Sequence, residues 1–289
     1  MKGTTVPGGR ADSVTASGGP TWSGWARARD ALSSACYRIM VVLALAGIVA
    51  PLLVIVFSSF SDTLYFSFPP KGLSVVAYRR FWANPTLRDA LRFSIVVGGV
   101  TMVCSLALAG PAAYAIGRFH FRGRSLIHAF LMLPILLPIL MVAIALVILI
   151  NVLHVPRHPA LLVASHVFVA TPFALRVLVA AFAGLDRGLE EASASLGARH
   201  LETLRRVTLP LLQPGFLSAA VLSFVMSFGQ ITMSLFLAGE GMTTLPVEIF
   251  LIADFSYDVA ITAVSVIVVA VALVIVVVVE RTTGLERVI

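Results

Sequence analysis

Residues 190–210 read EEASASLGARHLETLRRVTLP, a charged stretch of helix-forming residues inside an otherwise very apolar chain. Glu190 and Glu191 stand near its start, where the partial positive charge of a helix N-terminus favours acidic side chains. Gly197 permits the positive φ of a turn that ends a helix. Pro210 prevents a second helix from continuing unbroken. The stretch therefore predicts two short helices joined at Gly197.

The rest of the chain has the composition of a polytopic membrane protein. Of its 289 residues, 59% are hydrophobic and only 12% are charged, which is incompatible with an ordinary soluble domain of this length. The formal net charge of +7 is not gathered in basic clusters interleaved with aromatic residues, so nucleic acid is not expected as a partner. Residues 1–35 are rich in small residues and Arg without periodicity and predict a flexible cytoplasmic tail. Residues 36–289 are predicted to form one transmembrane domain, with the charged loop at about 184–211.

Six stretches are apolar and long enough to cross a bilayer, which requires a helix of about 20 residues. They lie near 38–60, 90–115, 126–153, 160–183, 212–238 and 258–280. The sequence thus predicts an all-α fold, a polytopic membrane bundle of six transmembrane helices. An even number of spans puts both termini on the same side.

Positive charge indicates which side that is, because basic residues are enriched in cytoplasmic loops. Basic residues gather before the first span, at 118–124, at 187–206 and at 281–287, whereas the alternate segments hold fewer. The segment 239–257 holds Glu240, Glu248 and Asp254 and no basic residue. Both termini and the charged loop are therefore predicted to be cytoplasmic. In the outer segment 61–89, the aromatic residues around Tyr78 and Trp82 predict a short interfacial helix.

The spacing within the charged stretch resembles the EAA loop of ABC importer permeases. The shared pattern is Glu-Ala-small, three residues, Gly, nine residues, a branched aliphatic residue, one residue and Leu-Pro. It is carried here by Glu191, Ala192, Gly197, Val207, Leu209 and Pro210. The segments 68–84 and 222–250 are similar to the corresponding regions of spermidine/putrescine-type permeases, a subfamily of the binding-protein-dependent transport inner-membrane components.

This resemblance implies that the chain is the transmembrane permease subunit of an ATP-driven, binding-protein-dependent ABC importer in a prokaryotic inner (cytoplasmic) membrane. The loop would form coupling helices that dock into a cleft on an ATPase subunit. The implied partners are two ATPase subunits, a second permease subunit of a different chain, an extracytoplasmic solute-binding protein and the lipid bilayer. The solute would be polyamine-like or a related small polar compound.

The chain itself is expected to do no chemistry and to need no cofactor, so no catalytic residue is predicted. No Gly-rich Lys-Ser/Thr phosphate loop occurs in it, so nucleotide must bind to another polypeptide. An intramembrane enzyme would need an activated nucleophile, but the adjacent Ser165 and His166 point about 100° apart on a helix. The six histidines fall on opposite sides of the membrane without a joint carboxylate or cysteine set, so no metal site is predicted.

A stripe of neutral polar residues marks the fifth predicted span. Spacings of four, three and four residues place its members on one helical face. They are Ser223, Ser227, Gln230 and Ser234. Two interpretations stay open: the stripe lines the translocation pathway, or it hydrogen-bonds a neighbouring helix. Polyamine permeases that resemble this chain often carry an acidic pair where Gly229 and Gln230 stand here.

Arg176 is an ionisable residue inside the fourth predicted span, where a central charge would cost about 2.5–3.5 kcal/mol. Its long side chain could reach the inner interface as an anchor, or it could serve gating or a partner contact. An ion-coupled secondary transporter is the alternative function. Such carriers place charged groups at the membrane midplane, and in them the charged loop has no role.

Overall fold

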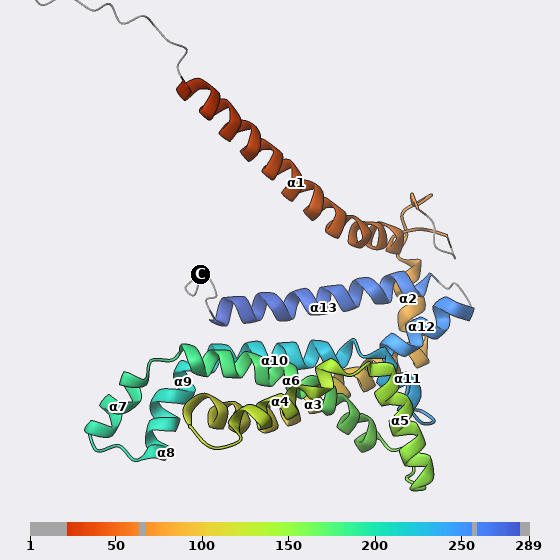
Figure 1. Cartoon of the computed structure of the whole chain (residues 1–289). Helices are drawn as coiled ribbons and strands as arrows, with labels where there is room; N and C mark the ends of the chain where they lie inside the picture. The colour runs from red at the N-terminus through yellow and green to blue at the C-terminus, as the bar shows by residue number, and fades with distance from the viewer. Residues whose placement is uncertain (1–21, 64–67, 256–258, 284–289) are drawn as a thin grey trace, which may run out of the picture. The chain divides into compact units, whose positions relative to one another are not determined.

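A computed structural model describes residues 22–63, 68–255 and 259–283 (Figure 1). Helices dominate these ranges, in which the β-structure is confined to an isolated bridge between Ser61 and Leu73. The predicted all-α class is therefore confirmed. The chain divides into two compact units, residues 1–53 and 54–289.

The first helix, α1 (Trp22–Ser59), begins earlier than the sequence predicts. Its segment Ser33–Ser59 is apolar and long enough to cross a membrane, in agreement with the predicted first span. Residues 22–35, predicted to belong to a flexible tail, are helical instead. The alternating Ala and Arg of residues 26–29 are strong helix formers, and they extend the helix backwards from its apolar part. Residues 1–21 of the predicted tail lie outside the described residues.

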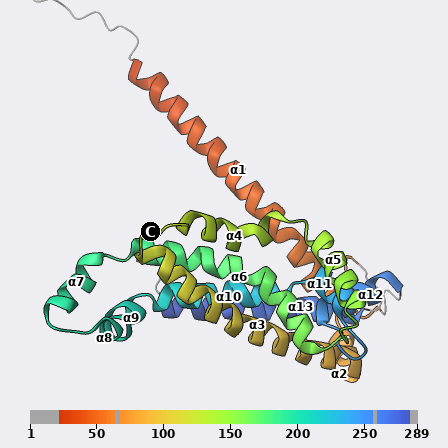
Figure 2. The same ribbon diagram turned by 60° about the horizontal axis from the view of Figure 1, so that its bottom comes forward.

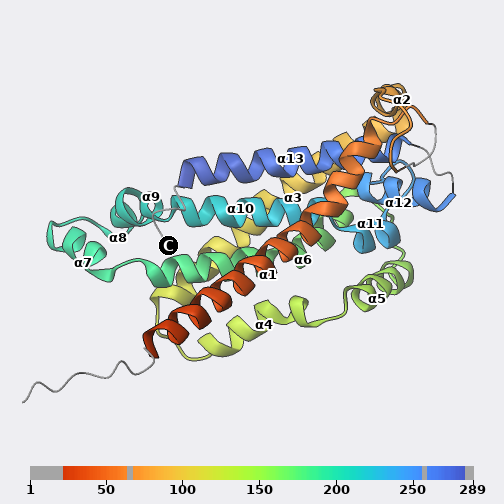
Figure 3. The ribbon, with the colours of Figure 1, turned by 90° about the horizontal axis from the view of Figure 1, so that it is seen from above.

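Long helices packed side by side form the body of the second unit. They are α3 (Pro85–Arg118), α6 (Pro159–Gly184), α10 (Gln213–Phe228) and α13 (Ala260–Thr283). Figure 3 shows α6, α10 and α13 lying side by side. A Cβ at Gly98 of α3 would lie 2.9 Å from the Phe224 ring of α10, and one at Gly215 of α10 would lie 2.6 Å from Ala181 of α6. Small residues thus let these helices approach closely, as is typical of membrane bundles.

The third and fifth predicted spans are not continuous helices. In the third, Pro134 and Pro138 predict a kink, because proline interrupts the hydrogen bonding of a helix. The third is divided into α4 (Arg124–Leu136) and α5 (Ile139–Val152), which are bent by 94° relative to each other. Leu137 is extended because it precedes Pro138, whose ring disfavours the helical conformation of the residue before it. The fifth stops at Phe228 and resumes as α11 (Ile231–Leu237) after Gly229 and Gln230.

Among the described residues, three helices are long and apolar enough to span a membrane, or up to five if each bent pair is one span. The three long helices are Ser33–Ser59, α3 and α6. A shorter apolar helix, Ala260–Val274, lies at the position of the sixth predicted span. Four helices gather at one end of the second unit (Figure 1): α2 (Val76–Ala83), α5, α11 and α12 (Leu245–Phe255). The predicted short helix of the segment 61–89 is α2, in which Phe81 is fully buried and Trp82 is 61% exposed.

Candidate functional site

The charged loop lies at the opposite end of the second unit, beyond the ends of α6 and α10 (Figures 1 and 2). Its first helix, α7 (Arg187–Ser195), begins where the Asp186 carboxylate accepts the Gly188 N–H at 2.9 Å. It ends in a left-handed turn at Gly197, with φ of +87°. The N–H of Gly197 and that of Ala198 donate to the carbonyls of Ala194 and Ser193, which satisfies the last turn of the helix. The predicted turn at Gly197 is therefore confirmed.

The second helix of the loop is irregular. It comprises α8 (His200–Thr203), a π-helical turn (Leu204–Thr208) and α9 (Leu209–Leu211). Pro210 cannot donate an N–H to the Arg206 carbonyl, and a π-helical turn is a common local answer to such a disruption. The prediction that Pro210 prevents the second helix from continuing unbroken is confirmed, because the helical path bends by 66° after Leu211 into α10.

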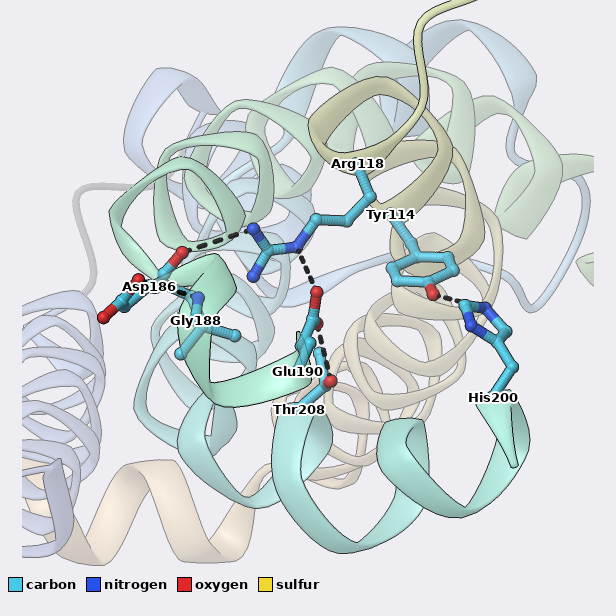
Figure 4. Close-up of polar contacts among 8 residues, drawn as sticks. Tyr114, Arg118, Asp186, Gly188, Glu190, His200 and Thr208 are labelled. Carbon is cyan, nitrogen blue, oxygen red and sulfur yellow. Dashed lines mark hydrogen bonds and ion pairs between the residues drawn. The ribbon is translucent and has the colours of Figure 1, made fainter. Parts of the chain in front are cut away.

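An ion pair ties the loop to the end of α3 (Figure 4). The Nε atom of Arg118 lies 3.3 Å from Oε2 of Glu190, and the two side chains are only 7% and 22% exposed. Nη1 of Arg118 donates to the Leu185 carbonyl at 3.2 Å, and Oγ1 of Thr208 donates to Oε1 of Glu190 at 2.7 Å. One carboxylate thus holds α3, α7 and the π-helical turn together.

A second polar contact lies beside this ion pair. The hydroxyl of Tyr114 in α3 lies 2.7 Å from Nε2 of His200 at the start of α8 (Figure 4). The Tyr114 ring also packs edge-on against Phe119 and tilted against Phe182. A cavity of about 160 Å³ lies between α3 and the loop at this place, lined by Tyr114, Glu190 and His200 among others. Polar bonds, more than dense apolar packing, therefore position the loop on α3.

Three apolar side chains of the loop are exposed. Leu189, Leu196 and Leu201 are 45%, 90% and 55% exposed, although each belongs to a short, otherwise polar segment. Exposed apolar side chains on a polar element are typical of a surface at which another protein binds.

The predicted motif residues all lie in the loop, but none of them forms the contacts that hold the loop on α3. Glu191, Ala192, Gly197, Leu209 and Pro210 are exposed, and Val207 is half-buried. The contacts to α3 come from residues that the motif does not include, namely Arg118, Tyr114, Glu190, His200 and Thr208. The sequence offers a signal for two of these residues, because Glu190 is an acid just before the motif and Arg118 is a basic residue at the end of a predicted span.

The polar stripe of the fifth predicted span faces the interior of the chain. Ser223 and Ser234 are fully buried and Ser227 is 3% exposed. His166 of α6 lies between two of them, with Nδ1 2.8 Å from Oγ of Ser227 and Nε2 3.0 Å from Oγ of Ser234. These hydroxyls belong to α10 and α11, so His166 bridges the break in the fifth span. Gln230 lies in that break and is half-buried.

The chain belongs to the family of binding-protein-dependent transport system inner membrane components, whose model matches residues 109–283. It is therefore a multi-pass membrane protein and the permease subunit of an ABC importer. The prediction of a transport subunit and not an enzyme is confirmed by this membership.

Curated relatives and solved structures agree with this assignment. The spermidine/putrescine transport system permease protein PotC of Haemophilus influenzae is 28% identical over 200 residues, which cover 69% of this chain and 77% of the relative. A probable molybdenum ABC transporter permease protein of Haloferax volcanii is 35% identical over 175 residues, which cover 58% of this chain and 65% of the relative. A chain of a bacterial ABC transporter involved in the import of the acidic polysaccharide alginate has the same fold, with a TM-score of 0.67, 17% identity and coverage of 88% of this chain and 97% of that one.

Proposed function

We propose that the loop from Asp186 to Leu211 is the element through which an ATPase subunit drives this permease. The single observation that carries the proposal is that the loop is bonded to the bundle and still exposes apolar side chains. It is bonded to α3 through Glu190 and Tyr114, and it exposes Leu189, Leu196 and Leu201. An element that is fixed to the bundle and has exposed apolar side chains suits the transfer of movement from a docked protein.

The charge bias of the sequence supports a cytoplasmic position for the loop. Arg187, Arg199, Arg205 and Arg206 are all exposed on it, whereas the segment 239–257 at the other end has no basic residue. Both termini are then cytoplasmic as well. The full importer would contain two ATPase subunits, a second permease subunit and an extracytoplasmic solute-binding protein. The description of the family supports the last of these, because it names transport that depends on a binding protein.

For the solute we propose a small charged compound, and two kinds are favoured by different relatives. The PotC relative is named for spermidine and putrescine, and the more identical archaeal relative is named for molybdenum. Neutral Gly229 and Gln230 stand at the break in the fifth span, where polyamine permeases often carry acids. A carboxylate pair would attract a polycation and repel an oxyanion such as molybdate, so its absence favours the oxyanion. We propose Gln230, at the break, as the residue of the stripe that faces the pathway.

The coupling proposal is tested by co-purification of the ATPase subunit with the tagged chain from native membranes. Leu196→Asp places a charge at one of these exposed apolar positions and is expected to abolish retention of the ATPase. Leu73→Asp is the matched control, because Leu73 is 86% exposed but lies in the segment before α2, at the opposite end of the unit. Retention in both variants, or loss in both, would contradict the proposal.

The solute is tested by uptake into cells that lack their own systems for both kinds of compound. Expression of the importer with its solute-binding protein should restore uptake of radiolabelled molybdate, with spermidine as the comparison. Restored uptake of spermidine without uptake of molybdate would show that the solute is a polyamine and not an oxyanion. Uptake of neither compound would refute both.

A further inference from the structure

Helix α4 is apolar along most of its length, yet none of its residues is buried by the part of the chain that the structure describes. It lies alongside α6 at the edge of the second unit (Figure 2). Two hollows follow one another along it, one lined by residues up to Ala129 and the next by residues from Phe130 onwards. The space between α4 and its neighbours is therefore open within the described part of the second unit.

The first hollow is wide, basic and next to the coupling end of the bundle. It has a volume of about 940 Å³ and is lined by Arg124, Ser125 and His128 of α4, with Ile116 of α3 and Val179 of α6 as its floor. The Arg124 guanidinium forms no ion pair with any residue that the structure describes. A cation and a hydroxyl donor beside an apolar floor suit an anionic headgroup.

The second hollow is narrower and almost wholly apolar. It has a volume of about 420 Å³ and is lined by Leu108, Leu133, Pro134 and Phe168 among others. The kink at Pro138, where α4 ends and the path bends by 94°, closes the row at its far end. This shape suits a hydrocarbon chain and offers almost nothing to a polar solute.

The two hollows together have the length of one membrane leaflet. From Arg124 to Leu137 is about 20 Å at the helical rise of ~1.5 Å per residue. The hydrocarbon core of a bilayer is about 30 Å thick, so half of it, about 15 Å, fits within the row. The basic hollow then lies at the depth of the headgroups and the apolar hollow at the depth of the acyl chains.

Arg176 adds a second cation at the side of this row. On α6, Arg176 lies between Pro172, which lines the apolar hollow, and Val179, which lines the basic hollow. Spacings of four and three residues place the three side chains on the same face of the helix, so Arg176 is adjacent to both hollows. It is exposed, and its guanidinium has no ion-pair partner within ranges 22–63, 68–255 and 259–283. An unpaired guanidinium at a membrane-facing position is costly unless an anion reaches it.

We propose that the groove between α4 and α6 binds one anionic phospholipid. Its phosphate lies between Arg124 and Arg176, and one acyl chain lies along Leu133 and Phe168. The proposal needs the chain to span a membrane but does not depend on the docking of an ATPase, so the two can fail separately.

The test is native mass spectrometry of the full chain released from nanodiscs that contain equal amounts of phosphatidylglycerol and phosphatidylethanolamine. Wild-type protein should retain one phosphatidylglycerol in preference to phosphatidylethanolamine. Arg124→Gln and Arg176→Gln should each lower that occupancy about fivefold, the equivalent of ~1 kcal/mol per arginine. Arg79→Gln in α2 is the charge control and should retain the lipid, because Arg79 is exposed at the other end of the unit.

A second pair of variants tests the apolar hollow. Ala164→Phe fills it and should lower retention, whereas Ala107→Phe, at an exposed position on α3 outside both hollows, should not. A phosphatidylglycerol with a photoreactive acyl chain, used with the wild-type protein, needs no variant to fold and should label peptides within 124–137 and 164–179.

Four results of these experiments would overturn the proposal, and a fifth from cross-linking would do so as well. They are equal retention of the two lipids, unchanged occupancy in both arginine variants, loss of lipid in the Arg79 control to the same extent, and labelling confined to other helices. Cross-linking of the groove to a second permease chain in place of lipid would show that a protein helix occupies it, and would also refute the lipid site.

Discussion

Replacing Glu190 with glutamine should loosen the loop of residues 186–211 from the bundle, while the neighbouring Glu191→Gln should not. Glu190 is the carboxylate that pairs with Arg118 and accepts from Thr208, whereas Glu191 is exposed. The glutamine amide keeps the shape of the side chain and one acceptor oxygen but removes the charge. It leaves the Arg118 guanidinium, which is 7% exposed, without a counter-ion.

The size of the effect follows from the burial of the two partners. Removal of one partner from a fully buried pair costs about 3–5 kcal/mol, and exposed pairs contribute less than about 1 kcal/mol. Glu190 is 22% exposed, so the pair lies between these limits and we expect a loss of about 2 kcal/mol. That corresponds to a roughly 30-fold larger population in which the loop is detached from α3.

Hydrogen–deuterium exchange of the permease alone, in nanodiscs, measures this population. Amides of residues 187–211 should exchange up to about 30-fold faster in Glu190→Gln than in the wild type, while α3 and α6 stay protected. Glu191→Gln should match the wild type. The same exchange in all three proteins, or equal acceleration in both variants, would refute the role assigned to the Arg118–Glu190 pair.

Three further changes test other parts of the structure. Gly197→Pro should leave membrane insertion intact but uncouple ATP hydrolysis from uptake in proteoliposomes, because the two helices of the loop are joined by the turn at Gly197, with φ of +87°. Gly184→Ala is the control and should behave as the wild type, because there is open space around its Cβ. His166→Phe should lower the melting temperature in detergent, because the buried hydroxyls of Ser227 and Ser234 lose their partner at a cost of about 1–3 kcal/mol each. Ser223→Ala is the control and should be nearly neutral, because that hydroxyl donates to the Ala219 carbonyl within its own helix. Gln230→Leu should change uptake kinetics if that side chain faces the pathway, and unchanged kinetics would assign it to helix packing.

Local features of the loop could be predicted from the sequence because they depend on neighbouring residues. The turn at Gly197 needs a residue that tolerates positive φ, and the irregular second helix needs a proline, so both are visible in one short stretch. The contact between Arg118 and Glu190 joins residues 72 positions apart. No local rule predicts which of two adjacent acids will face α3.

Pro138 predicts a kink in the third span, but the end of the helix there and the break in the fifth span escaped prediction for a related reason. Hydropathy measures whether a stretch is apolar on average, and the stretches 126–153 and 212–238 are both predominantly apolar. Whether a proline merely kinks a helix or ends it depends on the helices around it, which can satisfy the freed backbone groups. Pro111 lies inside the continuous α3, whereas Pro138 separates α4 from α5.

Helix α3 connects the loop with the opposite end of the second unit. At one end this helix is bonded to the loop through Tyr114 and Arg118, and at the other the Ser94 hydroxyl accepts the N–H of Leu245, the first residue of α12, at 2.7 Å. Its 34 residues extend over about 50 Å as one rod. If an ATPase moves the loop as proposed, the displacement reaches the contact between Ser94 and Leu245 along a single helix. Within that helix Pro111 lacks a backbone hydrogen bond, so the stiffness at this residue would decide how much of the displacement is transmitted.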